Sequence, residues 1–135
     1  MIVIDSSALA KYLLREVNWA LVEGFLAKGL YTVNHALKEV SNAIWKHAVV
    51  RKRIPGKLGL KVYEQLKRLV DGRVLILEEE DKYLDKAVNI AMRYGITVYD
   101  SLYIAQALKL GELVTSDRKQ AEVARKMGVK THYIE

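Results

Sequence analysis

Short runs of aliphatic and β-branched residues alternate with longer amphipathic segments along the whole chain. The short runs lie at residues 2–4, 31–33, 74–77, 96–99, 113–115 and 130–134. They are too short for helices and have the composition of strands. The segments between them repeat apolar residues at the three- and four-residue spacing of helices. This alternation predicts an α/β fold, a three-layer α/β/α sandwich around a central, mostly parallel sheet.

The expected helices occupy the intervals between the strands. We predict them at residues 8–14, 19–29, 35–51, 57–71, 78–93, 100–108 and 121–127. One of the serines at 6 and 7 and the side chain of Asn34 are the expected caps of the first and third helices. Gly95 is expected to end the fifth, because glycine tolerates the left-handed conformation of a helix end.

The length of 135 residues predicts one domain spanning residues 1–135, with a single core. The chain has no Cys, which excludes disulfides and thiolate metal sites and favours a reducing compartment. Its first residues lack a basic leader, and no apolar run approaches the length of a membrane span. We therefore expect a soluble cytoplasmic protein that does not contact a membrane.

The chain is basic, with 22 Lys and Arg against 16 Asp and Glu, a net charge of +6. This balance suits a polyanionic partner such as a nucleic acid, but also an ordinary soluble protein rich in lysine. Two basic groups are candidate contacts to phosphates. The first surrounds the turn at Pro55 and the second follows Asp117; they comprise Arg51, Lys52, Arg53, Arg118 and Lys119.

Three aspartates stand where a predicted strand passes into a helix: Asp5, Asp100 and Asp117. Each one alone is explained as a helix N-cap. Together they come from three distant segments, and in α/β sheets ligands bind at the carboxyl ends of the strands. We therefore predict that the three carboxylates lie at one edge of the sheet.

Glu39 is a fourth candidate, in the second turn of the helix that follows Asn34. A solvated helix charge explains it equally well from spacing alone. If the four carboxylates converge, their repulsion raises their pKa values unless cations neutralise them. An all-oxygen site of this kind suits Mg²⁺ or Mn²⁺, which can activate a water for attack on a phosphodiester.

Four segments carry a family resemblance in the order in which they occur. They are residues 2–9 (IVIDSSAL), 35–40 (HALKEV), 99–105 (YDSLYIA) and 113–117 (LVTSD). Together they resemble the ordered motifs of the PIN domain family, in particular small stand-alone PIN proteins that act as VapC-type toxins.

The resemblance implies a PIN-like fold and a magnesium-dependent endoribonuclease that cleaves RNA. By motif position it implies that Asp5, Glu39, Asp100 and Asp117 are the catalytic, metal-binding carboxylates. Ser7 and Thr115 are implied as supporting hydroxyls. It also implies a homodimer and a small antitoxin protein that packs on the first helices.

Two other functions stay open from the sequence. A structure-specific DNA nuclease would use the same four carboxylates. A non-catalytic α/β module, such as a phosphate-accepting receiver domain, differs in its motifs: it needs an acidic pair after the first strand, where this chain has Asp5 followed by two serines.

Overall fold

A computed structural model describes all residues, 1–135. Its centre is one five-stranded sheet, built from β1 (Ile2–Ile4), β2 (Leu30–Val33), β3 (Leu75–Glu78), β4 (Glu112–Thr115) and β5 (Lys130–Tyr133). The strand order is β3-β2-β1-β4-β5, and every neighbouring pair is parallel. The predicted α/β class with a mostly parallel sheet is confirmed, and the sheet is in fact entirely parallel.

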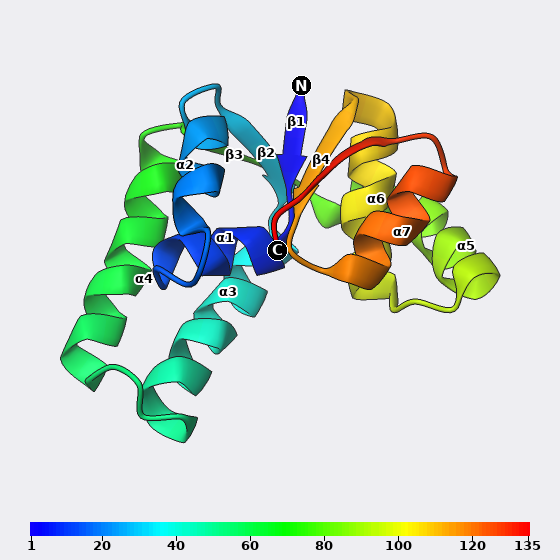
Figure 1. The fold of residues 1–135 in the computed structure, drawn as a ribbon. Coiled ribbons are helices and arrows are strands. Elements are labelled where there is room, and N and C mark those ends of the chain that lie inside the picture. Colours follow the sequence, from blue (N-terminus) through cyan, green and yellow to red (C-terminus); the bar gives the residue numbers. More distant parts are fainter.

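Seven α-helices connect the strands and cover the sheet. They are α1 (Ser6–Leu13), α2 (Trp19–Leu26), α3 (His35–Trp45), α4 (Gly56–Asp71), α5 (Leu84–Tyr94), α6 (Val98–Leu110) and α7 (Arg118–Lys126). The first four lie on one face and the last three on the other (Figure 1). The predicted three-layer sandwich is therefore confirmed.

Two hydrophobic cores lie on the two faces of the sheet because successive strand side chains point in opposite directions. Val3 and Leu113 pack with α5, α6 and α7, whereas Ile4 and Val114 pack with α1 to α4. Continuous apolar runs such as residues 2–4 are therefore required, since both faces of the central strands are buried.

The prediction of a strand at residues 96–99 is wrong. Gly95 ends α5 in a left-handed conformation, as expected, but Thr97 then caps α6, which begins at Val98. The Thr97 side chain accepts a hydrogen bond from the backbone N–H of Asp100 at 3.1 Å. Of the β-branched residues only Val98 enters the helix, because the Thr97 cap outweighs the modest strand preference of this short run.

Helix starts also differ from the predictions. Asp5, rather than a serine, caps α1 by accepting a hydrogen bond from the N–H of Ala8. Asn34 makes no capping bond to α3; its side chain instead contacts Glu79 and the backbone N–H of Glu80. The predicted helix at 78–93 starts later, since Glu78 ends β3 and a 3₁₀ turn over Glu80–Tyr83 precedes α5.

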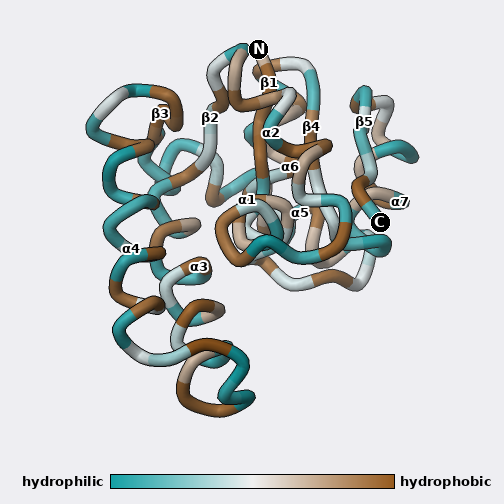
Figure 2. The backbone as a smooth tube through the Cα atoms, turned by 60° about the vertical axis from the view of Figure 1, so that its left-hand side comes forward, coloured by the Kyte–Doolittle hydropathy of each residue, from teal (hydrophilic) through white to brown (hydrophobic).

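Helices α3 and α4 form an arm that extends beyond the sheet (Figure 2). A π-helical segment, Lys46–Val50, continues α3 toward the turn at Pro55, so the predicted extent to about residue 51 is correct. Arg51, Lys52 and Arg53 are exposed at the end of this arm. None of the helices is both long and apolar enough to cross a membrane.

Candidate functional site

Two of the candidate acids meet where the direction of strand addition reverses. From β1 the chain adds β2 and β3 on one side, and later β4 and β5 on the other. Asp5 directly follows β1, and Asp117 lies two residues beyond the end of β4, its neighbour in the sheet. In open α/β sheets this crevice at the carboxyl ends of the strands is the usual ligand site.

The Asp5 carboxylate is buried, with 1% of the residue exposed, and is surrounded by hydrogen-bond donors. Ser7 Oγ lies 2.8 Å from each of its oxygens, and Thr115 Oγ1 donates to Oδ2 at 2.6 Å. The N–H of Ala8 donates to Oδ1 at 3.0 Å. A carboxylate has about four acceptor sites, so three donors leave it capacity for one further bond.

Burial raises the pKa of Asp5 to about 7. The hydrogen bonds from Thr115, Ala8 and Ser7 favour the charged form, but they do not compensate for the loss of water. The negative charge of Asp117 raises the pKa further. The carboxylate at the centre of the site therefore lacks a neutralising positive charge.

Asp117 is tied to Asp5 through the Thr115 hydroxyl, and its neighbour Ser116 is tied to Asp5 through the Ser7 hydroxyl. Thr115 Oγ1 accepts a hydrogen bond from the N–H of Asp117 at 3.0 Å while it donates to Asp5, and Ser7 Oγ accepts from the N–H of Ser116 at 2.9 Å. Asp117 also caps α7, since its Oδ1 accepts from the N–H of Gln120. Ser7 and Thr115 thus link the segments that follow β1 and β4.

Asp100 reaches this region from the first turn of α6, not from a strand end. The predicted location after a strand is therefore wrong, although the residue still approaches the other acids. Burial is the main cause of its raised pKa, followed by the negative charges of Asp117 and Glu39. Polar contacts from Thr97 and then Gln120 act in the opposite direction.

Glu39 faces the same region from the second turn of α3. Its Oε1 accepts hydrogen bonds from Tyr103 at 2.5 Å and from Ser6 at 3.1 Å. The protein contacts of Glu39 are to this one oxygen, Oε1. These two donors fix Glu39 in place, so it is more than the freely solvated helix charge that was the alternative from sequence.

The donor set suits a hard divalent cation. All four acids offer oxygen ligands, and Asp117 repels both Asp5 and Asp100. No group of three or more His, Asp or Glu side chains is placed to hold a metal ion jointly. Mg²⁺ does not require such a cluster, because it commonly binds one or two carboxylates and keeps several waters.

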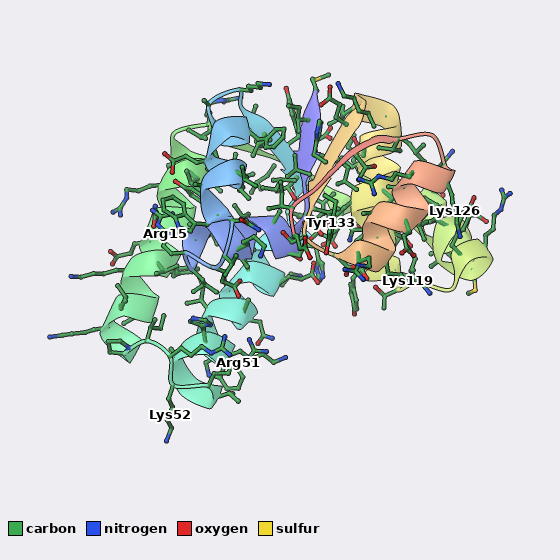
Figure 3. All side chains as sticks on the ribbon, viewed as in Figure 1. Arg15, Arg51, Lys52, Lys119, Lys126 and Tyr133 are labelled. Atoms are coloured by element: carbon green, nitrogen blue, oxygen red, sulfur yellow. The ribbon has the colours of Figure 1, made fainter.

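The predicted basic contacts separate into two groups. Arg118 and Lys119 are exposed at the start of α7, directly after Asp117. Arg51 and Lys52 lie at the far end of the arm, well away from Lys119 (Figure 3). Only the first group lies beside the acids.

Several residues at the site were missed from the sequence. Tyr103 and Ser6 support Glu39, and Tyr103 could have been found because it lies three residues after Asp100, on the same helix face. His35 and Tyr99 stack at the edge of the site. A separate apolar groove of about 500 Å³ between α3 and α4, lined in part by Trp45 and Tyr63, does not include the four acids.

Comparison with known proteins gives consistent matches over most of the chain. The PIN domain family model matches residues 2–126. Ribonuclease VapC3 from Pyrobaculum aerophilum is 32% identical over 127 residues, which cover 90% of this chain and 92% of the relative. The crystal structure of PAE2754 from the same organism superposes with a TM-score of 0.65 at 24% identity, covering 96% of this chain and 87% of that one. At that identity the structural match supports the fold alone.

Proposed function

This chain belongs to the PIN domain family, and from that membership we propose that it is a metal-dependent endoribonuclease acting as the toxin of a toxin-antitoxin pair. The family match and the relative named as a ribonuclease support a nuclease. The finer assignment to RNA cleavage rests on that relative and on the acidic site. We further propose that residues 1–135 act as one domain.

The observation that carries the proposal is the environment of Asp5. A buried carboxylate, contacted by two hydroxyls and repelled by Asp117, is disfavoured in its charged form unless a positive charge neutralises it. A residue that only capped α1 would not need to be buried or to lie beside another acid, as Asp5 does. A bound Mg²⁺ or Mn²⁺ supplies the missing charge.

We propose Asp5, Glu39, Asp100 and Asp117 as the carboxylates that would hold the ion, one or two of them directly and the others through its bound waters, since no three are placed to bind it jointly. When bound, such an ion lowers the pKa of a coordinated water and stabilises the charge that develops on the phosphate. Ser7 and Thr115 orient Asp5, and Tyr103 orients Glu39. These contacts fix the carboxylates before the substrate arrives, which is the basis of electrostatic preorganisation.

Arg118 and Lys119 are the proposed contacts to RNA phosphates, because they are exposed and adjoin Asp117. Their positive charge offsets the repulsion between the four carboxylates and a polyanionic substrate. Arg51, Lys52 and Arg53 lie at the end of the arm, so we assign them contacts only to RNA that extends beyond the site.

The direct test is RNA cleavage with Mg²⁺ or Mn²⁺, compared with cleavage in EDTA. We expect activity only with the ion, and we expect Asp100→Asn to remove most of it while circular dichroism and the unfolding midpoint stay close to wild type. Asp85→Asn, an exposed acid on α5, is the matched control and should retain full activity. Cleavage that persists in EDTA or in Asp100→Asn contradicts the proposal.

Flapped DNA offered in the same assay separates the two nuclease functions, since faster cleavage of DNA than RNA would favour the DNA nuclease. Calorimetric titration with Mn²⁺ addresses the non-catalytic alternative. We expect saturable binding that weakens in Asp117→Asn. Absence of saturable binding would favour a module that only binds its partner.

We also propose that the protein forms a homodimer in the cytoplasm and is inhibited by a small antitoxin protein. The VapC-type relative is the support for both statements. Light scattering of the purified chain tests the dimer. Coexpression with a small protein encoded beside this chain tests the antitoxin, which should co-purify and suppress cleavage.

A further inference from the structure

The edge of the site contains an exposed aromatic ring that the proposed chemistry does not use. Tyr99 lies in the first turn of α6, immediately before Asp100, and is 57% exposed. Single exposed aromatics are common on protein surfaces and need no explanation by themselves. What distinguishes Tyr99 is its fixed orientation beside the acids.

The ring of Tyr99 is stacked on the imidazole of His35. The ring centroids are 4.7 Å apart and the planes are inclined by 11°. This is an offset-stacked arrangement, which is favourable for aromatic pairs. Since His35 covers one face of the Tyr99 ring, the opposite face accounts for much of the exposed surface.

His35 itself lies between two carboxylates. Its ring nitrogens lie 3.8 Å from Glu39 and 3.8 Å from Glu80, and its side chain is 15% exposed. Glu80 is tied to the start of α3 because its N–H donates to the Asn34 side chain. The Tyr99–His35 stack is therefore anchored on α3 and α6, the two helices that carry Glu39 and Asp100.

We propose that the Tyr99–His35 stack is a stacking platform for one nucleobase of a single-stranded RNA, adjacent to the phosphate that is cleaved. The inference rests on the proposed ribonuclease function. A site of four carboxylates repels the RNA backbone, whereas a neutral ring face binds a base without that repulsion. Recognition of unstacked bases by aromatic side chains is the common mode for single-stranded RNA.

The position of the platform also predicts its role. His35, on which Tyr99 stacks, has a ring nitrogen 3.8 Å from Glu39, so a base on Tyr99 lies within a nucleotide or so of a phosphate at the acids. Stacking tolerates any base but favours purines, which have the larger ring surface. The platform therefore positions the strand and contributes a preference for a purine beside the cleaved bond.

The test uses a single-stranded RNA in which one 2-aminopurine is moved along the sequence, with Ca²⁺ in place of Mg²⁺ to slow cleavage. Stacking on an aromatic ring quenches 2-aminopurine fluorescence. We expect wild type and Tyr99→Phe to quench strongly at one position. Tyr99→Leu, which keeps apolar area without a flat ring, should not, and Tyr63→Ala, an exposed tyrosine on α4, should behave as wild type.

Cleavage kinetics provide the second readout. We expect Tyr99→Leu to raise KM by roughly 5- to 150-fold, the range for loss of one base stack, with kcat changed by less than about threefold. His35→Ala should raise KM by less, since the Tyr99 ring is kept and loses only the imidazole that stacks on its other face. A purely structural role for Tyr99 would instead lower the unfolding midpoint and leave KM unchanged.

The outcomes separate the platform from the underlying function. Quenching at one position by a protein that does not cleave RNA would support the platform and overturn the ribonuclease proposal. Metal-dependent cleavage with equal quenching and equal KM in wild type and Tyr99→Leu would overturn the platform alone. Absence of RNA binding by the wild type would overturn both.

Discussion

The burial of Asp5 predicts that the metal-free protein becomes less stable as the pH rises. The pKa of Asp5 is about 7 in the folded protein, against 3.8 for an ordinary aspartate. Between these values the folded state retains a proton that the unfolded state has released. Stability therefore falls as the pH increases from about 4 to 7, and the full loss is present above pH 7.

Replacement of Asp5 by asparagine removes this titration. A pKa rise of this size corresponds to at most about 4 kcal/mol, since one unit is about 1.4 kcal/mol. The asparagine keeps the size of the side chain and can still accept the N–H of Ala8. We therefore expect the stability of the variant relative to wild type to increase by about 2–4 kcal/mol between pH 4 and pH 8.

Urea denaturation in EDTA at pH 4, 5, 6, 7 and 8 measures the difference in unfolding free energy between the two proteins. Asp85→Asn serves as the control for removing an exposed carboxylate. Addition of Mg²⁺ at pH 8 should then stabilise wild type more than the asparagine variant. An ion that binds only the folded protein raises its unfolding free energy, and the variant lacks one of the proposed ligands. A difference between Asp5→Asn and wild type that does not change with pH would refute the electrostatic reasoning.

Three further predictions concern residues that support the site and the fold. Tyr103→Phe should lower kcat/KM for RNA about tenfold, because Glu39 loses a charge-assisted hydrogen bond, and should leave the unfolding midpoint nearly unchanged. Partial burial disfavours the charge of Glu78, but bonds from Lys82, Tyr83 and Gln106 together lower its pKa to about 2. Glu78→Gln should therefore cost about 1–3 kcal/mol at pH 7 in urea denaturation, and the cost should shrink as the pH falls from 4.5 toward 2. Gly95→Ala should cost about 1 kcal/mol in the same assay, since Gly95 ends α5 at a φ of +70°; an unchanged midpoint would contradict that reasoning.

The fold class followed from the sequence because its signals are local. Residues 2–4 and 113–115 must be buried on both faces, and such continuous apolar runs between amphipathic helices have few other solutions. Residues 96–99 gave the same local signal and were misassigned. Their conformation depends on the Thr97 cap and on packing of α6 against the sheet, which a four-residue pattern does not contain.

The residues of the candidate site also divide into those that local sequence signals predicted and those that only tertiary packing placed. Asp5 and Asp117 could be anticipated, because residues that follow a parallel strand within one or two positions lie at the carboxyl edge of the sheet. Ser7 and Thr115 were implied only by the family resemblance. Asp100 was anticipated for the wrong reason, since it reaches the acids from inside a helix. Its approach to Asp117 reflects how α6 and α7 pack side by side.

The amino-acid sequence by itself thus determined the α/β architecture, the strand-end positions of Asp5 and Asp117, and the family to which the chain belongs. Tertiary structure alone decided that β1 and β4 are neighbours, that Tyr103 and Ser6 converge on Glu39, and that His35 stacks on Tyr99. The physical reason is the range of the interactions. Periodicity and capping act over a few residues, whereas strand order and side-chain contacts across 33 or 64 residues arise only when both faces of the sheet are packed.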